Sequence, residues 1–80
     1  MQISLTGALR SAAGNAAEIE IEAKTIRELL RKLVEQYPRM DTALDEGIAV
    51  SINGQIYRDV MDVDIPEGAE VFLLPRLQGG

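Results

Sequence analysis

The 80-residue sequence contains no cysteine and no histidine, and its only aromatic residues are two tyrosines and one phenylalanine. Without cysteine the chain can form neither a disulfide nor a thiolate site. Without histidine it lacks the commonest proton carrier and metal ligand. These absences exclude much of enzyme chemistry, so we expect no catalytic activity from the chain alone. Any chemistry must use carboxylates, hydroxyls, lysines or the chain ends.

Basic residues and long apolar runs are also scarce. Eight Lys and Arg residues face thirteen Asp and Glu residues, which gives a net charge of −5 and a pI near 4.5. Nucleic acid is therefore not an expected partner, because phosphate binding needs a basic surface. No run is long enough for a membrane span, and the N-terminus lacks a signal-peptide pattern. We expect a cytoplasmic protein with no membrane or nucleic-acid partner.

The length fits one domain. Alternation of apolar and polar residues predicts short strands in the segments MQISLTGAL, AAEIEIEA, IAVSIN, QIYRDV and EVFLLP. Residues 10–15 are small and contain glycine, which indicates a loop or one helical turn. Asn53-Gly54 predicts a type I′ hairpin turn, and a second turn is expected at Pro66-Glu67-Gly68.

One strong helix is predicted to begin after Thr25 and to end before Pro38. Thr25 and Glu28 fit the S/T-x-x-E capping box, and proline disfavours helical geometry in the residue before it. Apolar residues recur at helical spacing along one face. They are Ile26, Leu29, Leu30, Leu33, Val34 and Tyr37. Residues 39–47 are expected to form a loop, with one helical turn at 42–45 as the alternative.

These elements predict a two-layer α+β domain, in which one main helix packs across one face of a mixed sheet of four to five strands. On the last strand, which we expect to be an edge or solvated strand, Val71 and Leu73 would face the helix, and Phe72 and Leu74 the other side. Either the apolar surface around Phe72 is exposed and binds a partner, or residues 39–47 or the region of Met61 cover it.

The last residues, LLPRLQGG, raise the question of function. We expect residues 1–75 to form the domain and residues 76–80 to form a flexible tail that ends in Gly-Gly. A tail of this length extends up to roughly 17 Å. Two glycines make the tail thin enough to bring the terminal carboxylate through a narrow channel into a remote active site, where a nucleotide triphosphate could activate it. Terminal glycines are also common in disordered ends, but here they closely follow the last strand of a compact domain.

Two acidic clusters could carry chemistry, the first as a metal site and the second as a pair of catalytic carboxylates. Glu18, Glu20 and Glu22 alternate along one strand with no converging third direction, which indicates a solvated face or a contact with a basic partner. Asp59, Asp62 and Asp64 lie near a turn, and turn chemistry explains them better. No metal site is predicted.

The element order, the Asn53-Gly54 turn, the block PEGAEVFLLP and the terminal QGG resemble the ThiS/MoaD family of small sulfur-carrier proteins. These are ubiquitin-like β-grasp proteins, and the resemblance spans the whole chain. The segment ALRSAAG, residues 8–14, is similar to the MoaD-like branch, the small subunit of molybdopterin synthase.

The resemblance implies a carrier cycle with no permanently bound cofactor. An adenylating enzyme related to ubiquitin-activating enzymes would use ATP to adenylate the Gly80 carboxylate. A persulfide donor would then replace AMP and leave a covalent thiocarboxylate on Gly80. The sulfur would pass to an acceptor enzyme such as the large subunit of molybdopterin synthase.

The same resemblance implies roles for residues near the C-terminus. Gly80 would carry the sulfur, and Gly79, Gln78, Leu77, Arg76 and Pro75 would fill the entry channel. Phe72, Leu74 and Tyr57 are the candidates for an apolar docking face. Three alternatives stay open: a sulfur carrier for thiamin, cysteine or another thio-metabolite, a ubiquitin-like modifier conjugated through Gly80, and a noncovalent interaction domain.

Overall fold

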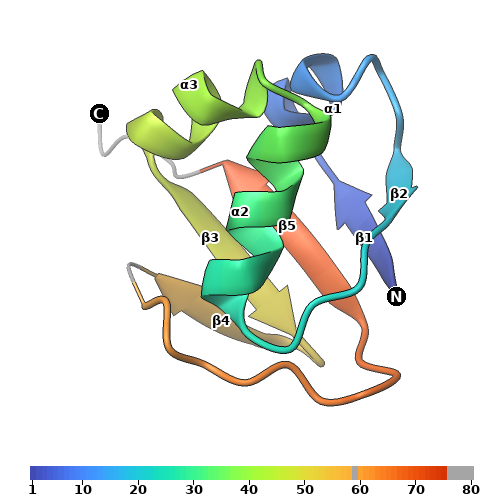
Figure 1. Cartoon of the computed structure of the whole chain (residues 1–80), viewed down its shortest axis with the longest axis vertical. Helices are drawn as coiled ribbons and strands as arrows, with labels where there is room; N and C mark the ends of the chain where they lie inside the picture. Colours follow the sequence, from blue (N-terminus) through green and yellow to red (C-terminus); the bar gives the residue numbers. More distant parts are fainter. Residues whose placement is uncertain (59, 76–80) are drawn as a thin grey trace.

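The computed structural model describes residues 1–58 and 60–75, which fold into a two-layer α+β domain (Figure 1). The strands form one mixed sheet in the order β2-β1-β5-β3-β4, in which β1 and β5 are parallel and the other neighbours antiparallel. The strands are β1 (Gln2–Leu5), β2 (Glu18–Glu20), β3 (Ile48–Ile52), β4 (Gln55–Arg58) and β5 (Val71–Pro75). The helices are α1 (Ala8–Ala12), α2 (Ile26–Gln36) and α3 (Met40–Glu46).

The helices lie on one face of the sheet, and the core fills the space between them and the strands (Figure 1). Leu29 and Leu33 of α2 and Leu73 of β5 are completely buried. Alternation along the strands supplies the other half of the core, because every second side chain points toward the helix. Val71 and Leu73 face the helices as predicted, and Phe72 and Leu74 are half-buried on the opposite face.

Helix α2 matches its prediction, and all four N–H groups of its first turn have acceptors. The Thr25 side chain accepts from the Glu28 N–H, and the Thr25 carbonyl accepts from the Leu29 N–H. The Glu28 carboxylate accepts from the backbone N–H of Lys24. At the other end, the helix stops at Gln36, just before Tyr37 and Pro38.

The other two N–H groups of the first turn donate to carbonyls of the segment that connects β4 and β5. The sequence did not predict this contact. The Ile26 N–H donates to the Val63 carbonyl, and the Arg27 N–H donates to the Met61 carbonyl, each at 3.0 Å. The Ile65 N–H donates back to the Lys24 carbonyl at 2.8 Å. These hydrogen bonds hold the connection between β4 and β5 against the start of α2. Its carbonyls accept from N–H groups that have no acceptor within the helix.

Both predicted turns are confirmed. Asn53 and Gly54 have φ values of +51° and +88°, as a type I′ turn requires. Gly68 has φ +77°, and the Ala69 N–H donates to the Pro66 carbonyl at 3.1 Å.

Some boundaries differ from the predictions. Strand β2 is only three residues long, because its neighbour β1 offers few residues to pair with, although single hydrogen bonds from Leu5 to Ala17 and from Ile21 to Met1 continue the pairing. Strand β4 ends at Arg58, and Asp59 lies outside the described residues. Residues 40–46 form helix α3 rather than a loop with one turn, because Met40, Ala43 and Leu44 pack on the core at helical spacing.

The last strand is not at an edge of the sheet. Strand β5 lies between β1 and β3, and the edges of the sheet are β2 and β4. Sequence alternation reveals which face a residue occupies but not which strands are neighbours. In the described part of the chain, no helix is long and apolar enough to cross a membrane.

Candidate carrier tail and docking face

The tail leaves the domain from the middle of the sheet, at a point where several elements meet. Pro75, the last residue of β5, lies opposite Ile48, the first residue of β3. On the other side, the Thr6 hydroxyl donates to the Leu73 carbonyl at 3.3 Å. Gly7 has φ +57°, and a Cβ atom placed there would lie 3.3 Å from Cγ of Pro75. The junction between β1 and α1 thus lies beside the end of β5, the strand that precedes the tail.

The contribution of Thr6 and Gly7 was not predicted. A glycine just after a strand is an ordinary loop signal, and only the parallel pairing of β1 with β5 brings it to Pro75. Residues 76–80 lie outside the described residues. The roles of Gly80 and of Arg76, Leu77, Gln78 and Gly79 therefore stay predictions, as does the channel role of Pro75.

The face of the sheet opposite the helices carries an apolar patch. Ser51 is paired with Phe72 on one side and with Ile56 on the other, and Ala49 is paired with Leu74 and with Arg58. Small side chains on β3 thus lie between larger ones on β5 and β4. Ile56 is 51% exposed, and Phe72 and Leu74 are half-buried. We call Phe72, Leu74 and Ile56 the apolar patch.

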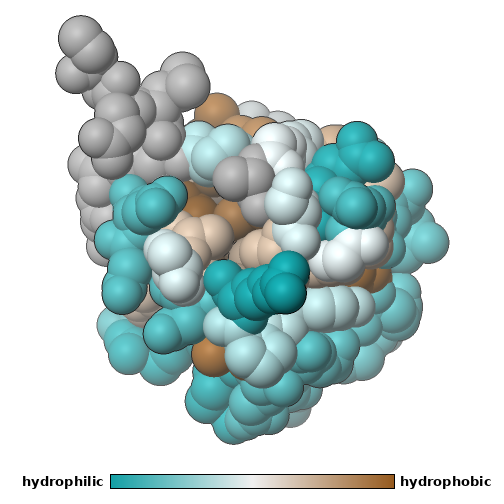
Figure 2. Space-filling view, turned by 90° about the horizontal axis from the view of Figure 1, so that it is seen from above, coloured by the Kyte–Doolittle hydropathy of each residue, from teal (hydrophilic) through white to brown (hydrophobic). Residues whose placement is uncertain are grey.

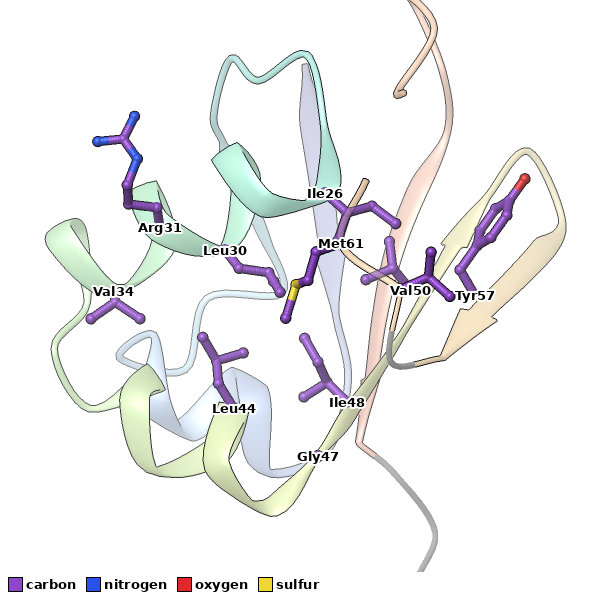
Figure 3. Close-up of a pocket in the computed structure, with 11 residues that line it drawn as sticks. Ile26, Leu30, Arg31, Val34, Leu44, Gly47, Ile48, Val50, Tyr57 and Met61 are labelled. Atoms are coloured by element: carbon purple, nitrogen blue, oxygen red, sulfur yellow. The ribbon is translucent and has the colours of Figure 1, made fainter. Parts of the chain in front are cut away.

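The expected cover over Phe72 lies elsewhere. Helix α3 is on the helical side of the sheet (Figure 1), and Met61 points into a groove on that side, between α2 and β3 (Figure 3). Of the two alternatives from the sequence, the structure therefore favours the uncovered patch. At the end of the domain that carries α1 and α3, by contrast, most of the surface is hydrophilic, with smaller hydrophobic areas between (Figure 2).

Tyr57 does not lie with Phe72 and Leu74. It pairs with Val50, whose side chain belongs to the core, so Tyr57 lies on the helical face and lines the groove there. The residue of β4 that joins the patch is Ile56. The face of Tyr57 could have been predicted from the sequence. A two-residue turn at Asn53-Gly54 pairs Val50 with Tyr57, and this register determines which side chains of the hairpin share a face.

An acidic corner adjoins the apolar patch at the end of the sheet far from the tail. Glu18, Glu20 and Glu70 line a hollow together with Ser4 and Phe72. We call these three glutamates the acidic corner. Among the described residues, no group of three potential ligands is arranged to hold a metal ion.

The α-amino group of Met1 lies beside this corner, 2.7 Å from Glu20 Oε1 and 2.6 Å from Glu22 Oε1. Hydrogen bonds to Glu20 and Glu22 raise the pKa of this amino group. The same ammonium, by hydrogen bonding and by its charge, lowers the pKa of Glu22. The Met1 ammonium therefore offsets part of the negative charge at this end of the sheet.

The helical face has an apolar groove of about 260 Å³ between α2, α3, β3 and the segment 60–61. Figure 3 shows Leu30, Leu44, Ile48 and Met61 directed toward one space, whereas the Arg31 guanidinium points away from it. The described residues that line the groove are mostly apolar, so the groove resembles a part of the hydrophobic core that is open to solvent.

The sheet order, the single long helix across one face and the C-terminal strand in the centre define a ubiquitin-like β-grasp protein. The family model of the ThiS family matches residues 3–80. The chain therefore belongs to the ThiS family of ubiquitin-like sulfur carriers. No curated protein matches the sequence.

Several solved structures share this fold. The small archaeal modifier protein 1 (SAMP1) of Methanosarcina acetivorans superposes with a TM-score of 0.80 at 24% identity, covering 99% of this chain and 94% of that one. The Amycolatopsis orientalis BexX/CysO complex contains a chain with a TM-score of 0.78 at 18% identity, covering 99% and 98%. CysO of Mycobacterium tuberculosis gives 0.77 at 16% identity, covering 95% and 98%. At these identities the likeness shows the fold.

Proposed function

We propose that this chain carries sulfur as a thiocarboxylate on Gly80 and donates it to a biosynthetic enzyme. The observation that carries the proposal is the match to the ThiS family, which extends over the C-terminal Gly79-Gly80. The fold supports it, since the chain reaches the tail from the central strand β5, whose Leu73 carbonyl accepts from the Thr6 hydroxyl and whose Pro75 lies beside Gly7.

The chemistry of the cycle comes from the partners. An adenylating enzyme joins the Gly80 carboxylate to the α-phosphate of ATP, which releases pyrophosphate and leaves an acyl-adenylate. The terminal sulfur of a protein persulfide attacks the Gly80 carbonyl and expels AMP, which forms an acyl disulfide. A thiol then reduces the S–S bond of this intermediate, so that the donor side becomes oxidised to a disulfide and Gly80 keeps the thiocarboxylate.

The composition agrees with this division of labour. The chain has no cysteine that could compete as a nucleophile or trap its own acyl-adenylate. Glycine at the C-terminus leaves the carbonyl unhindered. The chain is thus the substrate of each step, and the partners supply ATP, sulfur and catalysis.

Molybdopterin formation is the pathway that we propose, with the large subunit of molybdopterin synthase as the acceptor. It is supported by the likeness of residues 8–14 to the MoaD-like branch. In the structure this segment forms α1 and the turn at Gly14, which has φ +69°.

The test is the intact mass of the purified chain after incubation with the adenylating enzyme of the same organism, ATP, cysteine and a cysteine desulfurase. We expect the mass to rise by the difference between sulfur and oxygen, with the change confined to the C-terminal peptide. A chain lacking Gly79-Gly80 is the control and should not change. Failure of the intact chain to form an adenylate or a thiocarboxylate would overturn the proposal.

A second candidate is a protein modifier conjugated through Gly80 to lysines of other proteins. The observation that favours it is the structural likeness to a protein whose name includes "modifier", SAMP1. It predicts cellular proteins of higher mass that carry this chain, and their loss when Gly79-Gly80 is deleted.

A further inference from the structure

The apolar groove on the helical face reaches the start of β3, close to the point where the tail begins. It lies between α2, α3, β3 and the segment 60–61, and its volume is about 260 Å³. Met61, which points into it, is 42% exposed. A cavity of about 150 Å³ in another protein holds benzene, so this groove has room for an aliphatic side chain. Apolar surface left open in this way indicates a binding site.

The pairing of β3 with β5 shows which segment of the chain can reach the groove. Pro75 is paired with Ile48, which lines the groove together with Gly47. Pro75 has the same parity as Leu73, which is buried on the helical side, because alternate residues of a strand share a face. In an extended chain Leu77 has this parity too, at most about 7 Å beyond Pro75. The single leucine of residues 76–80 is therefore within reach of the groove.

The end of α3 carries a charge that complements the tail. Asp45 and Glu46 are the last two residues of this helix, both are exposed, and its last turn contains no basic residue. Because the C-terminal carbonyls of a helix carry partial negative charge, a cation near them is stabilising. Gly47 follows Glu46, and one further step of the strand register places Arg76 opposite Gly47. The tail thus brings a guanidinium to the acidic end of α3.

We propose that the groove binds the chain's own tail, with the Leu77 side chain between Leu44 and Ile48, which point toward the same space (Figure 3). Arg76 then lies beside the carboxylates at the end of α3. The bound tail makes a closed form of the carrier, because Gly80 cannot enter a remote active site while Leu77 is held by the domain. This last step rests on the proposed function, whereas the binding of Leu77 does not.

Reach and charge favour the tail over other occupants. A separate small ligand needs convergent polar groups to orient it, but the lining is mostly apolar and the Arg31 guanidinium points away (Figure 3). A tethered segment has a high effective concentration at the groove and loses less freedom on binding than a separate molecule does. A second copy of the chain also has a net charge of −5, which opposes its approach.

Methyl NMR of the full chain tests the closed form without any partner. We expect nuclear Overhauser effects between the methyl groups of Leu77 and those of Leu44 and Ile48, and none to Ile56 on the opposite face. Leu77→Ser should shift the methyl signals of Leu44 and Ile48. The control Gln78→Ser, which changes a polar residue of the same tail, should leave them in place. Equal shifts in the two variants, or Overhauser effects to Ile56, would overturn the proposal.

A charge exchange tests the contact with α3. Arg76→Glu should weaken the Overhauser effects and move the methyl signals toward their positions in Leu77→Ser. Asp45→Lys/Glu46→Lys in the same chain should restore them, because opposite charges face each other again. A loss that the second pair does not restore would overturn this arrangement of the tail. Signals that change on dilution would show that the tail enters a second copy, which would overturn the closed form.

The closed form also predicts a kinetic effect with the purified adenylating enzyme of the same organism. Val34 lines the groove and is half-buried, so Val34→Ser should weaken the binding of Leu77. If about half of the chains are closed, the KM for the carrier in ATP–pyrophosphate exchange should fall about twofold with kcat unchanged. The control Val63→Ser makes the same substitution at a half-buried position outside the groove lining and should leave KM unchanged.

Equal KM values for Val34→Ser and the intact chain would overturn the closed form as a control on loading. A chain whose groove binds Leu77 but which is never adenylated would instead overturn the proposed function alone. A chain that is adenylated but shows no Overhauser effects between Leu77 and the groove would overturn this inference alone.

Discussion

Gly7 lies between the end of β1 and the start of α1, with φ +57° and ψ −134°. A side chain is strained in this conformation, and a Cβ atom would also approach Cγ of Pro75 to 3.3 Å. Glycine at this position therefore has two roles. It adopts the backbone conformation that leads into α1, and its lack of a side chain leaves room for Pro75.

We predict that Gly7→Ala lowers the free energy of unfolding by about 2–3 kcal/mol. Gly14→Ala is the matched control, because Gly14 also has positive φ, at +69°, but no atom lies within 4 Å of its Cβ position. It should cost about 1 kcal/mol, from the backbone conformation alone. Urea unfolding measures both. Equal losses would show that the contact with Pro75 has no energetic role.

At the scale of the element, the register of the hairpin of β3 and β4 determines which side chains lie on the open face of the sheet. Its two-residue turn places Ile56 on the open face and Tyr57 on the helical face. A shift by one residue would exchange them and would also expose Val50 and Ile52, so the buried face fixes the register.

We predict opposite effects for two neighbouring substitutions in β4. Ile56→Ala should change the free energy of unfolding by less than about 0.5 kcal/mol, because the side chain is 51% exposed, and should weaken binding to the adenylating enzyme. Tyr57→Ala should cost about 1–2 kcal/mol, because the half-buried ring lines the groove on the core side, and should leave binding unchanged. Denaturation and calorimetry on both variants test this, and weaker binding of Tyr57→Ala would contradict it.

Much of the element structure could be predicted from the sequence, because local rules determine it. The cap at Thr25, the stripe from Ile26 to Leu33 and the turn at Asn53-Gly54 each depend on residues near one another in the chain. The errors concern relations between distant segments. The central place of β5, the contact of Gly7 with Pro75 and the support of α2 by Met61 and Val63 arise from tertiary pairing, which no local pattern encodes.

At the scale of the whole molecule, we expect the domain and the tail to have separate roles. Among the described residues, the buried core lies between Ile3 and Leu73, and the two glycines that end the chain have no side chain to bury. The acidic corner and the apolar patch also lie within the domain. Docking and stability should therefore belong to the domain, and sulfur loading to the tail.

Deletion of Gly79-Gly80 tests this division. We predict that the free energy of unfolding changes by less than about 0.5 kcal/mol, because glycine has no side chain to pack into a core. Binding to the adenylating enzyme should persist, because the folded domain and its apolar patch remain. Adenylate formation, followed by release of pyrophosphate, should be abolished, since the new terminal carboxylate of Gln78 ends roughly 7 Å short of where Gly80 placed it. Replacing both glycines by alanine keeps the length and is the control for reach. If the alanine variant is loaded and the shortened chain is not, length is what the tail supplies. If neither is loaded, the tail also needs residues without side chains at positions 79 and 80.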